Sequence, residues 1–181
     1  MDSADVIGAT RLWLERAVIG LHLCPFAASV YAGGRVRFQV SEQTSNHGLL
    51  EQLRAELLWL QAQDARLWET TLLIHPCALT DFLAYNDFLS DCDAMLADLD
   101  LEGELQIASF HPQYQFAGTR PDDIENYTNR SPFPMLHLLR EESIERALGG
   151  LSDGDEIYRR NIRTLRGLGI EGWRRLWEGA A

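Results

Sequence analysis

The sequence predicts a single α/β domain built on a small, three-stranded, mostly parallel sheet with flanking helices and a long ordered loop. Three short apolar segments are typical of strands, two amphipathic segments lie between them, and an aromatic-rich segment without periodicity follows the third. Strand, helix, strand, helix, strand is the order of successive βαβ units, whose strands run parallel. A ferredoxin-like α+β sheet is the alternative. At 181 residues the chain has the size of one domain, which we expect to span residues 1–181.

Two helices are predicted at the start of the chain. Apolar residues recur at helical spacing from Asp5 to Leu21, and Ser3 can cap this helix. Proline disfavours helical geometry in the residue before it, so the pattern breaks at Cys24. A short helix over 25–31 is expected to follow, with Cys24 at its N-cap.

The three predicted strands come next, at Arg35–Ser41, Thr70–His75 and Leu105–Phe110. Each gap between them holds one amphipathic helix, and Thr80 is the expected N-cap of the second. The apolar face of the first helix consists of Leu49, Leu50, Leu53, Leu57 and Leu60, and that of the second consists of Phe82, Tyr85, Phe88, Leu89, Cys92, Met95 and Leu99.

The segment 111–134 has no usable periodicity, although loops of this length are uncommon in compact domains unless they are functional or disordered. Its apolar anchors predict an ordered loop packed over the domain; they are Tyr114, Phe116, Ile124, Tyr127 and Phe133. Helices are predicted over Met135–Leu148 and Asp155–Leu165. Trp173 and Trp177, four residues apart, are expected to fasten the C-terminal turn.

The composition narrows the partners and the compartment that we expect for this protein. The formal net charge of −11 argues against nucleic acids and anionic membranes as partners, since both would repel it. No apolar run approaches the roughly 18–20 residues that span a bilayer, and the first residues do not resemble an export signal. Three cysteines, without a C-x-x-C pair, fit free thiols in a reducing compartment. We therefore expect a cytoplasmic protein.

The chain contains no lysine, because all 16 of its basic residues are arginine. Schiff-base catalysis, covalent attachment of pyridoxal phosphate, a Walker-type phosphate loop and a protein-kinase site all need a lysine. These chemistries are excluded within this chain.

Two histidines, His75 and His111, directly follow predicted strands, and each is followed by proline. Ligands of open parallel sheets bind at the carboxyl ends of the strands, so both imidazoles are expected at one edge. A His-Pro pair is equally a polar turn, and the sequence leaves both interpretations open.

The predicted helix after the loop places His137, Arg140 and Glu141 on one face, which can supply metal ligands or form a salt-bridged surface stripe. His137 can also be a buried, hydrogen-bonded core residue. Ser131 would cap this helix, and free N–H groups beside Arg130 would suit a carboxylate or phosphate. The predicted binding residues are Tyr127, Asn129, Arg130 and Arg140.

Cys24 is the third chemical element of the predicted site. At a helix N-cap its thiolate would be stabilised by free N–H groups and by the helix dipole, as in a reactive cysteine. The alternative is a small buried apolar residue.

Several segments resemble a bacterial and plant family of uncharacterised proteins, domain of unknown function 1415. The resemblance rests on AVIGLHLCPFA, ETTLLIHP, YNDFL, QIASFHPQYQF and DDIENYTNRSPFPMLHLLRE, and it covers nearly the whole chain. It implies a single-domain protein and no known activity. The matching polar positions are Cys24, His75, His111, Asn129, Arg130, His137, Arg140 and Glu141, whereas His22 stands where the family more usually has asparagine.

Three functions remain open. The first binds or converts an anionic small molecule, with Cys24, His111 and His137 as catalytic groups. The second is a zinc or iron enzyme whose metal is held by His75, His111, His137 and Glu141. The third is a non-catalytic adaptor that binds a partner through the aromatic loop 111–134.

Overall fold

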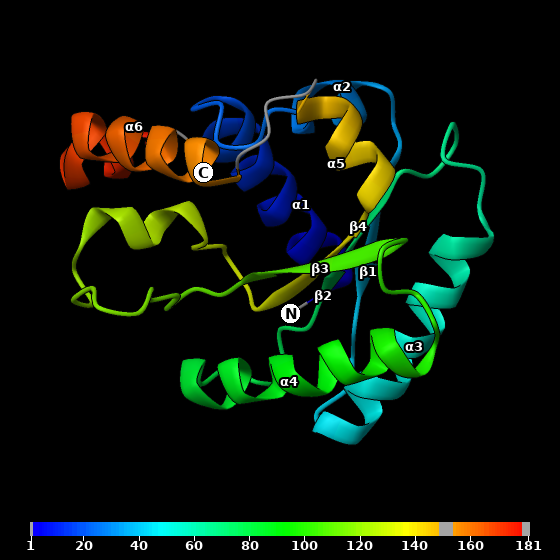
Figure 1. The fold of residues 1–181 in the computed structure, drawn as a ribbon. Helices are drawn as coiled ribbons and strands as arrows, with labels where there is room; N and C mark the ends of the chain where they lie inside the picture. The colour runs from blue at the N-terminus through cyan, green and yellow to red at the C-terminus, as the bar shows by residue number, and fades with distance from the viewer. Residues whose placement is uncertain (1, 149–153, 179–181) are drawn as a thin grey trace.

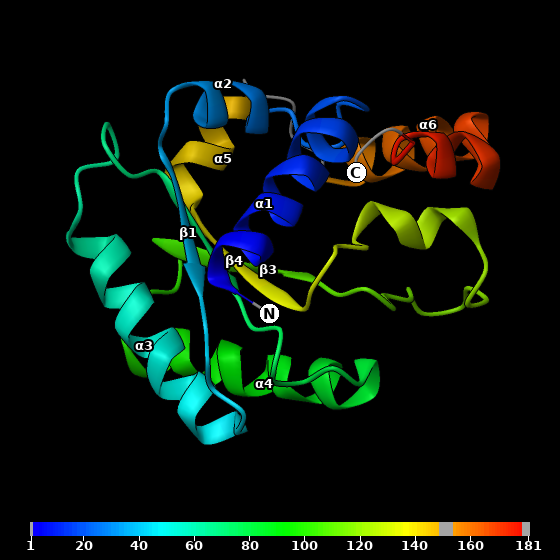
Figure 2. The same cartoon turned by 180° about the vertical axis from the view of Figure 1, so that it is seen from behind.

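The computed structural model describes residues 2–148 and 154–178, and these form one mixed sheet between two layers of helices (Figures 1 and 2). The strands are β1 (Val36–Val40), β2 (Thr70–Ile74), β3 (Leu105–Phe110) and β4 (Met135–Arg140), and their order is β1-β2-β4-β3. β1 and β2 pair in parallel, and β4 pairs antiparallel with both β2 and β3. β1, β2 and β3 therefore run in one direction and β4 in the other.

The helices divide between the two faces of the sheet. α3 (Asn46–Ala62) and α4 (Phe82–Asp98) cover one face, as Figure 1 shows. The other face carries α1 (Ser3–Trp13), the π-helical η1 (Leu14–Ile19), α2 (Ala27–Ala32) and α6 (Gly154–Arg175). The short α5 (Glu141–Leu148) directly follows β4. None of the helices in the described ranges has both the length and the apolar composition needed to cross a bilayer.

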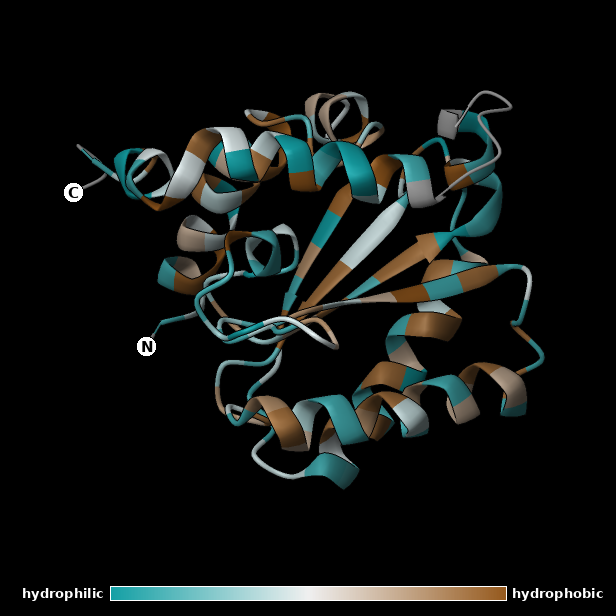
Figure 3. Ribbon diagram, turned by 60° about the vertical axis from the view of Figure 1, so that its left-hand side comes forward, coloured by the Kyte–Doolittle hydropathy of each residue, from teal (hydrophilic) through white to brown (hydrophobic). Residues whose placement is uncertain are grey.

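Strand alternation divides the core into two clusters. Leu73, Leu136 and Leu138 belong to the cluster under α3 and α4, whereas their strand neighbours Leu72 and Met135 belong to the cluster under α1 and α6. Figure 3 shows hydrophobic residues along the strands between the two helical layers. Both faces of the sheet are covered, so the central strands β2 and β4 are buried along almost their whole length.

Most of the predicted helices and strands are present, but the residues that cap the helices differ from those predicted. Asp2 rather than Ser3 caps α1, and Asp81 rather than Thr80 caps α4, in each case through a side-chain oxygen that accepts a backbone N–H. The helix predicted over 25–31 begins at Ala27, with Phe26 as its N-cap residue. The predicted N-cap role of Cys24 is therefore wrong.

The α/β class is confirmed, but the three-stranded, mostly parallel sheet is wrong, because Met135–Arg140 forms a fourth strand instead of a helix. Leucine and methionine favour helices, and a short apolar run fits a buried strand or a buried helix equally well. The run is buried on both faces between β2 and β3, so tertiary pairing overrides the local preference. The ferredoxin-like alternative is not observed either, because β1 and β2 are adjacent and parallel.

The loop over 111–134 is ordered, as predicted, and contains the 3₁₀ helix η2 (Ile124–Thr128). The buried Asn126 organises it. Its Oδ1 accepts from Phe116 N at 3.0 Å and from the Thr119 hydroxyl at 2.8 Å, and its Nδ2 donates to Arg120 O at 2.8 Å. The loop lies beside α6 in both views (Figures 1 and 2).

Candidate functional site: an aromatic cavity at the carboxyl edge of the sheet

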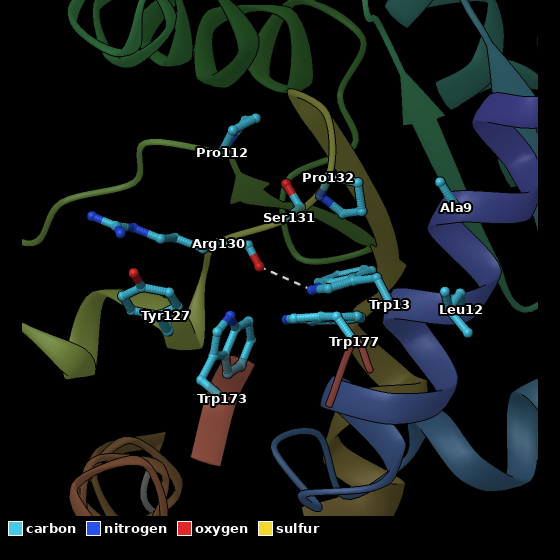
Figure 4. Close-up of a pocket in the computed structure, with 10 residues that line it drawn as sticks. All are labelled: Ala9, Leu12, Trp13, Pro112, Tyr127, Arg130, Ser131, Pro132, Trp173 and Trp177. Carbon is cyan, nitrogen blue, oxygen red and sulfur yellow. Dashed lines mark hydrogen bonds between the residues drawn. The ribbon is translucent and has the colours of Figure 1, made fainter. Parts of the chain in front are cut away.

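A cavity of about 420 Å³ lies where β3 ends and β4 begins. This edge holds the carboxyl ends of β1 to β3, which is where the sequence predicts a ligand site. The volume is within the ordinary range of small-molecule pockets, roughly 300–1,000 Å³. The lining residues, shown in Figure 4, are Ala9, Leu12, Trp13, Pro112, Tyr127, Arg130, Ser131, Pro132, Trp173 and Trp177.

Aromatic rings from three segments form most of the cavity wall. Trp13 ends α1, Tyr127 lies in η2, and Trp173 and Trp177 lie at and just after the end of α6. Tyr127 meets Trp173 edge-on with ring centroids 5.0 Å apart, and Trp173 meets Trp177 at 5.6 Å. The C-terminal tryptophans do fasten the chain end, and they also form the cavity.

Arg130 is the charged residue among those that line this cavity. Its Nε donates to Tyr114 O at 3.2 Å and its Nη2 to Pro121 O at 2.6 Å, while the guanidinium lies over the Tyr127 ring, 4.3 Å from the centroid. Among the described residues no carboxylate forms an ion pair with it. The carbonyl of Arg130 accepts from Trp13 Nε1 at 2.9 Å, the dashed line in Figure 4. Arg130 is therefore a cation held in place by backbone carbonyls, and none of the acids in the described ranges pairs with it.

Two other predicted binding residues have structural partners. Asn129 Nδ2 donates to Ser109 O at 3.0 Å, which ties the loop to β3. Arg140 Nη2 donates to the carbonyls of Leu60 and, at 2.9 Å, Gln63, so it satisfies the C-terminal end of α3 on the opposite face of the sheet. Neither residue lines the aromatic cavity.

His75 is fully buried at the end of β2. Its Nδ1 lies 2.9 Å from Ala78 O, to which it donates, and its ring stacks on Tyr85 of α4 with centroids 5.8 Å apart. Burial lowers the pKa of His75 to about 4, with a smaller contribution from nearby His111. The side chain is a neutral core imidazole at pH 7.

His111 also contacts Tyr85, with ring centroids 5.1 Å apart. Its Nδ1 accepts from Gln113 N at 3.0 Å, so its Nε2 carries the proton and donates to Leu79 O at 3.2 Å. Burial lowers the pKa of His111, although the neighbouring carbonyls oppose the shift. Both ring nitrogens are occupied in the neutral form, so His111 braces the start of the loop.

His137 lies on the opposite face of the sheet from Tyr85 and its two histidines. His137 lies in β4, where it pairs with Leu72 of β2 and Ala108 of β3. Its ring stacks on that of Phe26, with centroids 6.4 Å apart. The structure thus brings His75 and His111 together around one tyrosine and places His137 with Cys24 in a separate, inner cavity. The predicted convergence of these four residues at one site is not observed.

The predicted His137–Glu141 ligand pair depended on a helix that does not form. His137 is in β4, and Glu141 begins α5 with its backbone N–H bonded to Glu104 O. Within the described ranges no three His, Cys, Asp or Glu side chains are grouped to hold a metal ion. The predicted helix cap at Ser131 fails for the same reason, and its hydroxyl donates to Phe133 O at 2.7 Å.

Cys24 is surrounded by protein, and burial raises the pKa of its thiol. The N–H groups of Phe26 and Ala27, with Arg160, favour the thiolate but do not outweigh the burial. The physical setting is the reverse of the activated cysteine that the sequence suggests.

The aromatic side chains of the loop point inward. Tyr114 packs against Phe82 and Phe116, and Phe116 packs against Tyr158 of α6. In the described part of the chain, the large exposed hydrophobic side chains lie outside the loop; they are Leu67, Leu83, Tyr158 and Ile170. This packing fits a loop that shapes a cavity better than one that presents an adaptor surface.

Sequence reasoning identified Tyr127 and Arg130 but missed Trp13 as part of the site. Its position on the apolar face of the first helix is also that of a core residue. Its indole N–H, which needs a partner when buried, was the available signal.

The described residues thus define an α/β protein with an aromatic cavity, lined also by one arginine, at the carboxyl edge of a mixed sheet. The chain belongs to the family described as "Protein of unknown function (DUF1415)", whose profile matches residues 5–175 and confirms the resemblance. No curated protein and no solved structure is significantly similar to it.

Proposed function

We propose that this protein binds a small anionic molecule with a flat apolar body in the cavity at the carboxyl edge. The observation that carries the proposal is Arg130, a cation fixed by two backbone carbonyls, without an acidic partner among the described residues, on the wall of a cavity of about 420 Å³. A fixed guanidinium suits a carboxylate or phosphate, and it loses little entropy on binding.

The tryptophans define the rest of the ligand. Trp13, Trp173 and Trp177 offer large, rigid ring faces and edges to one molecule. Aromatic rings in contact contribute about 0.5–1.5 kcal/mol beyond the area they bury. An aromatic carboxylate has the charge and shape that this wall recognises.

The proposal is for binding, and it assigns no reaction. Cys24, His111 and His137 do not line the cavity, and the hydroxyl of Ser131 is engaged with a carbonyl. The proposed site therefore contains groups that hold a ligand rather than a nucleophile with its base.

Titration with 2-naphthoate and its neutral amide tests the proposal. Naphthoate should quench tryptophan fluorescence and bind about tenfold more tightly than 2-naphthamide, because a charged hydrogen bond contributes roughly 1.5–3 kcal/mol. Arg130→Gln should remove this preference, and Trp177→Leu should weaken both ligands. Arg120→Gln is the matched control, because this loop arginine is exposed and already paired with Asp123.

Equal binding of the acid and the amide to the wild-type protein would refute the role of the charge. Failure of both to bind at millimolar concentration would refute the site. Near-UV circular dichroism of each variant separates lost recognition from lost folding.

A further inference from the structure

A second cavity, of about 150 Å³ and partly open to the surface, lies between the sheet and the layer formed by α1, η1 and α2. Its wall is almost entirely hydrocarbon, from aromatic and aliphatic side chains of both layers. His137 and Cys24 are the exceptions that bring a nitrogen and a sulfur to it, beside Thr70 at the start of β2. A cavity of this size is large enough for a benzene-sized molecule.

The hydrogen bonds of Thr70 fix the protonation of His137. The Thr70 hydroxyl lies 2.6 Å from Leu138 O and 2.7 Å from His137 Nε2. A carbonyl only accepts, so the hydroxyl donates its single proton to Leu138 and must accept from Nε2. Nε2 therefore carries the hydrogen of the neutral ring, and Nδ1 is left as an acceptor.

Nδ1 of His137 has no partner among the described residues, although the ring is enclosed by protein. The ring keeps accessible surface because it borders the cavity. An acceptor left unsatisfied in such a place costs about 1–3 kcal/mol. A buried water needs two to four polar partners, and Nδ1 with the weakly polar Cys24 thiol holds one poorly.

We propose that this inner cavity is a binding site for a small, uncharged, largely apolar molecule with one hydrogen-bond donor, such as an alcohol or a phenol, which donates to His137 Nδ1. The hydrocarbon wall accommodates the body of the molecule, and the single acceptor orients it. A charged ligand is disfavoured because the wall offers no opposite charge to replace its hydration. The proposal is independent of the anion site at Arg130.

Phenol and toluene are the matched probes, because they have nearly the same shape and differ in the hydroxyl. Isothermal titration calorimetry at pH 7.5 should show phenol binding about fivefold more tightly, since a neutral hydrogen bond contributes roughly 0.5–1.5 kcal/mol. In two-bond ¹H–¹⁵N spectra, the Nδ1 resonance of His137 should move upfield with phenol and stay in place with toluene.

Two variants locate the site. His137→Phe keeps the ring volume without the acceptor, so it should still bind toluene but lose the preference for phenol. Ala108→Leu adds a side chain to the cavity wall and should abolish binding of both probes. Arg120→Gln is the control and should bind phenol as the wild type does, because this exposed arginine lines neither cavity and pairs with Asp123.

Equal affinity of the wild type for both probes, or a stationary Nδ1 resonance at saturating phenol, would overturn the proposal. Unchanged phenol binding by a folded Ala108→Leu protein would also overturn it, because the probe would then bind elsewhere. The spectra of the wild type decide the question if either variant fails to fold.

Discussion

Mild acid should destabilise this protein well above the pH at which carboxylates titrate. His75 and His137 are buried as neutral rings, and burial lowers the pKa of each to about 4 from the ordinary value of 6.5. As the pH falls below about 6.5, these two histidines bind protons in the unfolded chain but stay neutral in the folded chain. Their contribution to the free energy of unfolding is therefore constant above this pH and decreases between about pH 6.5 and pH 4.

The size of the effect follows from the two shifts. Between pH 7.5 and pH 5.0 each histidine removes about 2 kcal/mol from the free energy of unfolding, so the pair removes about 4 kcal/mol. Domains of this size are stable by roughly 5–15 kcal/mol, so the loss is a large part of the total. His111, whose pKa burial also lowers, adds to it in the same direction.

Urea unfolding followed by tryptophan fluorescence at pH 7.5 and 5.0 measures this loss. His137→Phe removes one of the two groups, so the difference between the two pH values should shrink by about 2 kcal/mol, whatever the variant does to stability at pH 7.5. His47→Gln is the control, because His47 is exposed in the first turn of α3 and its replacement should leave the difference unchanged. Equal losses for His137→Phe and the wild type, within about 0.5 kcal/mol, would refute the reasoning.

Other consequences follow from single contacts. Tyr85→Phe should lower the free energy of unfolding by about 1–3 kcal/mol, because the Tyr85 hydroxyl accepts from Phe110 N at 3.0 Å inside the core. Urea unfolding measures this loss, and a change under about 0.5 kcal/mol would contradict the prediction. Arg140→Met should cost about 1.5–3 kcal/mol in the same assay, since it removes the charged donor from the carbonyls of Leu60 and Gln63 at the end of α3. A variant as stable as the wild type would disprove that role. Iodoacetamide at pH 8 should alkylate the exposed Cys77 before Cys24, because burial raises the pKa of the Cys24 thiol. Mass spectrometry of the peptides gives the order of alkylation, and the reverse order would show an activated Cys24.

The sequence predicts the elements that carry strong local signals. β3 is found at the predicted residues, β1 is one residue shorter than predicted at each end, and β2 is one residue shorter at its C-terminal end, because each strand is bounded by turn residues. The helices α3 and α4 follow from apolar residues at helical spacing. β4 carries no such signal: its apolar run is too short for its periodicity to distinguish a strand from a helix, and its pairing with β2 and β3 is a long-range property.

The prediction of a helix where β4 forms accounts for most of the differences between the predicted and the observed site. A helix over Met135–Leu148 would have placed His137 and Glu141 on one face near the loop. As a strand, β4 points His137 to the layer of α1 and Arg140 to the layer of α3. Tyr127 and Arg130, which the sequence predicts as binding residues, line the cavity because their loop follows β3, and their role in binding stays a prediction. The role of Trp13 depends on packing between segments more than 100 residues apart.

Trp13 borders both cavities, since its indole lines the outer one beside Arg130 and the inner one beside His137. The ring is held by its hydrogen bond to Arg130 O and by an edge contact with Phe110 at 5.4 Å. A ligand that displaces this ring from either side changes the volume available on the other side. If ligands of both proposed sites move this ring, their binding is coupled, and the coupling is reciprocal: the factor by which the outer ligand changes the inner affinity equals the factor by which the inner ligand changes the outer affinity.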